Sequence, residues 1–108
     1  MSKYGYLRDL IVREGLVRAE TLIAPALANP PLLSLAHNAG YVERVMTMAL
    51  APEEVKRIGL PQSEAMRRRV RLSAAGTLLA ARLALAEGVA CNAAGGSHHA
   101  DFDGGAGF

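Results

Sequence analysis

The chain has 108 residues, of which 51% are hydrophobic, with a mean hydropathy of +0.16 and a formal net charge of +2. These values fit one small domain, exclude a disordered composition, and fall short of the charge of a dedicated nucleic-acid-binding module. No apolar run is long enough to span a membrane, and the first residues do not resemble a secretory signal, so we expect a cytoplasmic protein. The single cysteine, Cys91, excludes an internal disulfide and a cysteine-built zinc site.

The N-terminal half is predicted to consist of short helices joined by loops. Residues 29–31, Asn-Pro-Pro, are predicted to be a loop, because Pro31 disfavours the α conformation at Pro30. Pro52 followed by Glu53 and Glu54 is typical of a first helical turn. The predicted helices cover residues 3–14, 32–36, 41–50 and 52–58.

The longest predicted element is a helix that begins after Ser63, a suitable N-cap, and ends near Glu87, before Gly88. It carries two apolar stripes, which indicates that its C-terminal half is covered on more than one side. Four arginines near its start, within residues 67–71, are interpreted as a solvated end of the helix. A phosphate or RNA contact is the alternative, but no aromatic side chain is interleaved with these arginines.

The run that follows, residues 89–94, is short, apolar and uncharged, and predicts a buried parallel strand with Cys91 packed inside it. A long helix leading into such a strand is half of an α/β unit. We find no second strand for it to pair with. The sequence therefore predicts an α/β fold class, mostly helical within this chain, as a piece of a larger parallel-sheet domain.

The last fourteen residues hold five of the eleven glycines and the adjacent pair His98 and His99. Loops that leave the C-terminal end of a parallel strand often carry the chemistry of α/β proteins, and imidazoles titrate near neutral pH. Two other interpretations stay open at this point. The segment is a flexible glycine-rich tail, or His98, His99, Asp101 and Asp103 form a metal site.

These residues resemble the zinc-dependent histone deacetylase family. Residues 92–100 read Asn-Ala-Ala-Gly-Gly-Ser-His-His-Ala, and Gly107-Phe108 follows at the family's spacing. His37 and Tyr41 match a His-x-x-x-Tyr segment, although His37 is interpreted as structural and satisfied by local backbone. Residues 57–61, with Gly76-Thr77, resemble the bacterial and class IV branch. The resemblance covers residues 1–108 as one partial domain of the arginase/deacetylase type, truncated at both ends relative to the family.

The resemblance implies a hydrolase that removes an acyl group from acetyl-lysine or a related N-acetyl amine. His99 matches the family's general base, and His98 matches a histidine that gives electrostatic stabilisation. Gly107 and Phe108 match residues that line the acyl-lysine tunnel. The family's zinc ligands and catalytic tyrosine lie in later segments, so zinc is expected in the complete enzyme and this chain alone is expected to be inactive.

The substrate implied by the resemblance is an acetylated protein or a small N-acetyl amine, with no specific nucleic acid and no membrane. The alternative function is a non-enzymatic helical interaction protein with a flexible glycine-rich tail. The long alanine-rich helix is the feature that favours it, because such helices also pack against partners.

Overall fold

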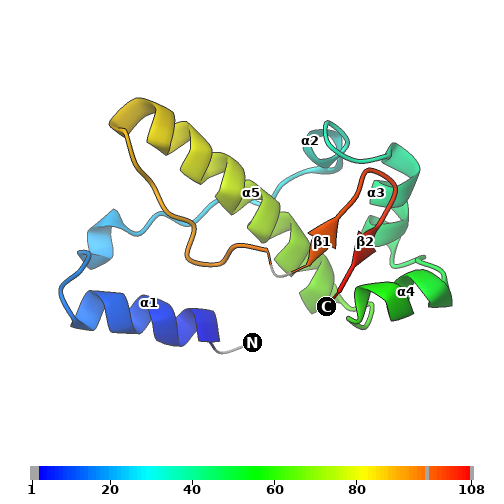
Figure 1. Cartoon of the computed structure of the whole chain (residues 1–108), viewed down its shortest axis with the longest axis horizontal. Helices are drawn as coiled ribbons and strands as arrows, with labels where there is room; N and C mark the ends of the chain where they lie inside the picture. Colours follow the sequence, from blue (N-terminus) through cyan, green and yellow to red (C-terminus); the bar gives the residue numbers. More distant parts are fainter. Residues whose placement is uncertain (1–2, 97, 108) are drawn as a thin grey trace.

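The computed structural model describes residues 3–96 and 98–107, which are mostly helical and end in one small sheet (Figure 1). α5 runs through the middle of the molecule, α1 lies toward one end, and the helices α2, α3 and α4 gather near the hairpin at the other end. The elements are α1 (Lys3–Arg13), the 3-10 turn η1 (Ala19–Thr21), α2 (Pro30–Leu33), α3 (Ala39–Thr47), α4 (Pro52–Ile58), α5 (Glu64–Glu87), β1 (His99–Ala100) and β2 (Gly105–Ala106).

The helix boundaries follow from local capping chemistry. The Ser63 hydroxyl accepts a hydrogen bond from the Met66 N–H at 3.1 Å and starts α5, as the sequence predicts. Gly59 and Gly88 end α4 and α5 with φ values of 73° and 95°, a region that favours glycine. The side chain of Asn38 similarly caps the start of α3.

The prediction of a loop over residues 29–31 is wrong, because α2 begins at Pro30. The Asn29 side chain accepts a hydrogen bond from the Leu32 N–H at 2.9 Å and serves as the N-cap. Proline is tolerated in a first helical turn, where its missing N–H has no intrahelical partner to lose. The local capping interaction outweighs the restriction that Pro31 places on Pro30.

The predicted parallel strand over residues 89–94 is also not formed. The only strand pairing among the described residues is antiparallel, between β1 and β2, with His99 opposite Ala106 and Ala100 opposite Gly105. The prediction that Cys91 is buried is wrong as well, since Cys91 is exposed. A central strand exists only where a neighbouring strand satisfies its backbone groups, and the described residues provide no such neighbour for this segment.

The segment instead contacts α5 through the Asn92 side chain and through the Ala94 carbonyl, which accepts from the Ser73 hydroxyl at 3.5 Å. The Asn92 amide donates to the Thr77 hydroxyl at 3.2 Å, and the Asn92 carbonyl oxygen accepts from the Ala94 N–H at 3.1 Å. Gly76 makes this approach possible, because a Cβ there would lie 3.0 Å from the Asn92 amide nitrogen. The small residues of α5 therefore admit a close neighbour, which in this structure is a polar side chain.

Three of the four arginines near the start of α5 form hydrogen bonds to segments that are distant in sequence, so the interpretation of a solvated end is wrong for these three. The exception is Arg68, whose side chain takes part in none of the hydrogen bonds of the described residues. The Arg69 guanidinium also lies 5.7 Å from the centre of the Tyr4 ring. The bonds are Arg67 Nη1 to the Met46 carbonyl at 2.9 Å, Arg71 Nε to the Ala28 carbonyl at 2.7 Å, and Arg69 Nη2 to the Tyr4 hydroxyl at 3.3 Å.

The apolar core is small for a chain of this length. The buried hydrophobic residues are Ala28, Val42, Leu50, Ile58 and Ala75. Large apolar side chains remain in solvent elsewhere, with Leu85 90% and Leu16 73% exposed. The radius of gyration is 15.2 Å, against about 13 Å for a compact domain of this size. Among the described residues, none of the helices combines the length and apolarity needed to cross a bilayer.

We expect the isolated 108-residue chain to show helical circular dichroism but a broad thermal transition and concentration-dependent association. So little buried apolar area gives a weak driving force for cooperative folding, and exposed leucines favour self-association. Circular dichroism melts at several protein concentrations measure this. A sharp, concentration-independent transition of a monomer would contradict the prediction.

Candidate functional site

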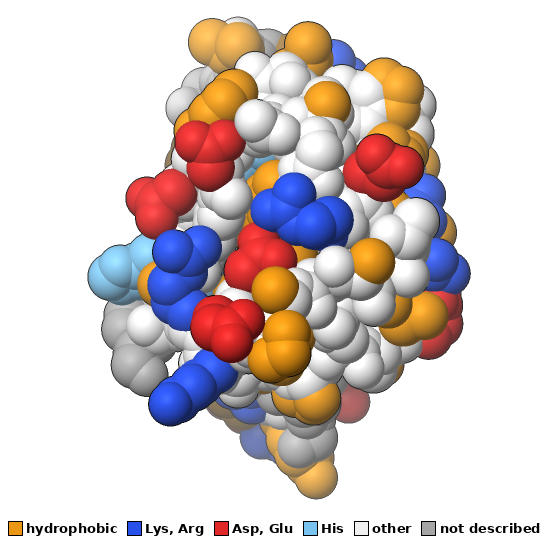
Figure 2. Space-filling view, turned by 90° about the vertical axis from the view of Figure 1, so that its right-hand side faces the viewer, with side chains coloured by type: hydrophobic (Ala, Val, Ile, Leu, Met, Phe, Trp, Pro, Cys, Tyr) orange, Lys and Arg blue, Asp and Glu red, His pale blue; other side chains and the backbone are white. Residues whose placement is uncertain are grey.

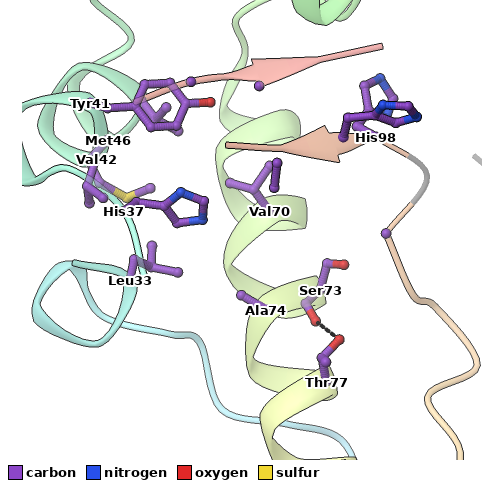
Figure 3. Close-up of a pocket in the computed structure, with 16 residues that line it drawn as sticks. Leu33, His37, Tyr41, Val42, Met46, Val70, Ser73, Ala74, Thr77 and His98 are labelled. Carbon is purple, nitrogen blue, oxygen red and sulfur yellow. Dashed lines mark hydrogen bonds between the residues drawn. The ribbon is translucent and has the colours of Figure 1, made fainter. Parts of the chain in front are cut away.

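A cavity of about 410 Å³ lies between α3, α5 and the hairpin. Its apolar wall comes from α3 and α5, with Val42, Met46 and Val70 among its side chains. Figure 3 shows His37 and Tyr41 on one side of this cavity and His98 on the opposite side, with Val70 of α5 between them. The cavity is thus mainly apolar, with imidazole and phenol groups at its edge.

The structure brings both predicted histidines to this cavity. His98 is half-buried, whereas His99 is exposed and forms the first residue of β1. The interpretation of a flexible tail is wrong for residues 98–107, because they form a hairpin that packs against the helices. Of the two predicted tunnel residues, Gly107 follows β2, and Phe108 lies outside the described residues.

The N-terminal end of α3 holds the turn of the hairpin. His37 Nδ1 donates to the Asp101 carbonyl at 2.9 Å, and the Asn38 N–H donates to the Phe102 carbonyl at 2.8 Å. His37 is therefore bound to backbone, but its partner is 64 residues away in sequence rather than local. The hydrogen bond to a carbonyl requires a proton on Nδ1.

The C-terminal end of α4 holds β2. Arg57 Nε donates to the Gly105 carbonyl at 3.0 Å, and the Gly107 N–H donates to the Arg57 carbonyl at 2.9 Å. The backbone passes very close to α4 here, because a Cβ on Gly107 would overlap the Ile58 carbonyl oxygen. Gly107 is thus needed for this packing, whatever its relation to a substrate.

Comparison with known proteins matches the histone deacetylase domain to residues 1–108. The chain belongs to the histone deacetylase family. An uncharacterized protein of Picosynechococcus sp. is 39% identical over 108 residues, which are 100% of this chain and 36% of that protein. Histone deacetylase 2 of Arabidopsis thaliana is 28% identical over 113 residues, which cover 99% of this chain and 29% of that protein. The chain spans about a third of the length of the curated relatives it matches.

The described part of this histone deacetylase family chain does not assemble a metal site by itself. No group of three or more histidine, cysteine, aspartate or glutamate side chains in residues 3–96 and 98–107 is placed to hold an ion. The alternative metal site from His98, His99, Asp101 and Asp103 is accordingly not formed by these four residues. Zinc does not fit the described residues alone, so none of them is assigned as a ligand.

Tyr41 also lines the cavity. From the sequence it was noted only as the tyrosine of the segment that resembles the family's His-x-x-x-Tyr. Its ring meets the His37 ring edge-on, with centroids 6.0 Å apart. Burial raises the pKa of the Tyr41 hydroxyl above its ordinary value, and the negative charge of Glu54 acts in the same direction. Tyr41 is therefore a neutral phenol at physiological pH, which can donate or accept a hydrogen bond at the cavity edge.

An ion pair joins α3 to α4. Arg44 contacts both carboxylate oxygens of Glu54, at 2.8 and 3.3 Å, and Glu54 also accepts from the Ala51 N–H at 2.9 Å. On the face at this end of the molecule, acidic and basic side chains are interspersed (Figure 2).

The Arg44 hydrogen bond, followed by the Ala51 N–H, holds the pKa of Glu54 below its ordinary value. A lowered pKa in the folded state stabilises the fold above the unfolded pKa of about 4.3, and this stabilisation is lost as pH falls through the lower folded value. We expect Glu54→Gln to lower the Tm at pH 7, with the difference from wild type shrinking below about pH 4.

Both sequences are placed in the Picosynechococcus relative in exchange for its matching residues, so that the transition is cooperative, and thermal melts between pH 7 and pH 3 measure this dependence. Glu20→Gln is a suitable control, because Glu20 makes no ion pair among those of the described residues. A Glu54→Gln difference that stays constant across the pH range would contradict the prediction.

Proposed function

We propose that this chain supplies the His98–His99 part of the active site of a hydrolase that cleaves the acyl amide of acetyl-lysine or a related N-acetyl amine. The observation that carries the proposal is the pair of adjacent histidines at one cavity, in a chain that the histone deacetylase domain matches throughout. Residues 1–108 then form part of a larger α/β domain of the arginase/deacetylase type.

The roles proposed for the two imidazoles follow from the chemistry of amide hydrolysis. His99 accepts a proton from the attacking water as the new C–O bond forms at the acyl carbon. When the C–N bond breaks, that proton passes to the leaving amine, and the products are a carboxylic acid and an amine, between which the acid proton is transferred to give a carboxylate and an ammonium group. His98 stabilises the negative charge that develops on the acyl oxygen.

We propose that the acyl-lysine chain lies along Gly107, which follows β2, and along Phe108, which is outside the described residues. The apolar cavity wall supports an apolar acyl or alkyl group near the histidines. The substrates proposed are cytoplasmic acetylated proteins or small N-acetyl amines, with neither nucleic acid nor membrane as a partner.

We propose that zinc is held by residues outside the described part of this chain. When bound in such enzymes, zinc lowers the pKa of water and polarises the amide carbonyl. We expect the isolated chain neither to deacylate nor to bind zinc tightly, because catalytic zinc sites use three protein ligands. Zinc-dependent turnover by the purified 108-residue chain would contradict this.

The function is tested in a chimaera in which this chain replaces the matching residues of the Picosynechococcus relative. The chimaera, the parent protein and the isolated chain are incubated with acetyl-lysine peptides and N-acetylated polyamines, and released acetate is measured. We expect release by the parent and the chimaera only. A folded chimaera that cleaves no substrate of the parent, or a parent that cleaves none of the panel, would contradict the proposal.

A further inference from the structure

The second strand of the hairpin is held by one residue of α4 on both sides of the position opposite His99. His99 pairs with Ala106 in the antiparallel ladder. The two residues that flank Ala106 are each hydrogen-bonded to Arg57. The Arg57 side chain donates to the Gly105 carbonyl, and the Gly107 N–H donates to the Arg57 carbonyl. We propose that Arg57 is a positioning residue for His99, an inference that rests on the proposed function of His99.

Glycines let the hairpin lie close against α4 at this point. A Cβ on Gly107 would overlap the Ile58 carbonyl oxygen, which is a backbone atom, whereas a Cβ on Gly104 would meet the end of the exposed Arg57 side chain. A slip of one residue would move the Ala106 side chain toward the Ile58 carbonyl. Because such a slip also turns strand side chains to the opposite face, the two Arg57 bonds that hold β2 favour the present pairing of His99.

The hairpin needs support from outside because the sheet is too small to fix its own geometry. Each strand has two residues, and an isolated two-stranded hairpin is marginally stable in water. The other contacts, from His37 and Asn38, reach Asp101 and Phe102 in the turn. The Arg57 contacts are made by Gly105 and Gly107, which flank Ala106, the residue that pairs with His99.

Loss of Arg57 should displace the His99 imidazole from the reacting water while leaving the substrate-binding wall of α3 and α5 in place. The expected signature is a fall in kcat with little change in KM.

The experiment uses the chimaera with four variants: Arg57→Ala, His99→Ala, the double variant, and Lys56→Ala as the control. Lys56 is an exposed cation that neighbours Arg57 on α4. Deacylation rates and hydrogen–deuterium exchange of the peptide that covers residues 98–107 are measured for each. We expect Arg57→Ala to lower kcat by about 10- to 100-fold, since a misplacement of about 1 Å can cost that much. We also expect faster exchange in the hairpin, and neither effect in Lys56→Ala.

The double variant separates positioning from a general loss of structure. If Arg57 acts through His99, Arg57→Ala should cause no further loss of rate in the His99→Ala background. If the rate losses of the two single variants multiply in the double variant, the inference is overturned. Unchanged hairpin exchange in Arg57→Ala would overturn it as well, even if the chimaera cleaves no amide, so this readout is separate from a failure of the proposed function.

A second variant removes the same contact more conservatively, should Arg57→Ala fail to fold. Arg57→Met keeps an unbranched apolar stem but has no donor for the Gly105 carbonyl, and we expect it to lower kcat and speed hairpin exchange in the wild-type background. An Arg57→Met protein with wild-type rates and exchange would overturn the inference.

Discussion

His99→Ala is expected to lower the deacylation rate of the chimaera by about 100- to 10,000-fold, the usual contribution of a general base. The imidazole lies at the cavity on a hairpin that α3 and α4 both hold, so its loss removes a proton acceptor at a fixed place. The measurement is kcat/KM with an acetyl-lysine peptide, together with the zinc content of each purified variant.

His98→Ala is the matched comparison, because it removes an imidazole from the adjacent position. We expect a smaller loss, since its proposed role is electrostatic, although such support can approach the size of general-base catalysis. Neither variant should lose metal, because neither histidine is assigned as a ligand. A His99→Ala protein that loses its zinc, or that keeps near-normal rates with zinc bound, would contradict the assigned role.

Gly107→Ala is expected to destabilise the hairpin by about 1–3 kcal/mol, the usual cost of forcing an extra methyl group into a packed site. The new Cβ would overlap a backbone carbonyl, that of Ile58, which cannot move aside as a flexible side chain can. The same displacement breaks the bond from the Gly107 N–H to the Arg57 carbonyl. We therefore expect a lower Tm and a loss of activity in the chimaera.

Gly95→Ala is the control for this prediction. A Cβ on Gly95 would meet no atom within 4 Å, and the backbone there is not in the left-handed region. Such a substitution should change stability by less than about 0.5 kcal/mol. A Gly107→Ala chimaera with the Tm of Gly95→Ala would show that the close packing of the hairpin on α4 is not required.

The sequence alone determined where α4 and α5 begin and end, because these boundaries depend on residues close together in the chain. It was less accurate for α3, predicted over residues 41–50 but observed over Ala39–Thr47. Ser63 at an N-cap, and glycines at positions 59 and 88 with positive φ, set boundaries through contacts within one turn. The family was also apparent from the spacing of residues 92–108, and the histone deacetylase domain match confirms it. Pro30 shows the limit of such local rules, since the Asn29 cap outweighed them.

The hairpin and its attachment were decided only by the tertiary structure. The strand predicted for residues 89–94 required a neighbour, and strand pairing is a property of two segments rather than of one apolar run. The bonds that hold the hairpin join His37 to Asp101 and Arg57 to Gly105, across 64 and 48 residues of sequence. Single hydrogen bonds to backbone carbonyls leave no periodicity or spacing in a sequence, because any residue supplies the carbonyl. In the sequence, Arg57 belongs only to residues 57–61, which resemble the bacterial and class IV branch, and the fold alone places β2 against it.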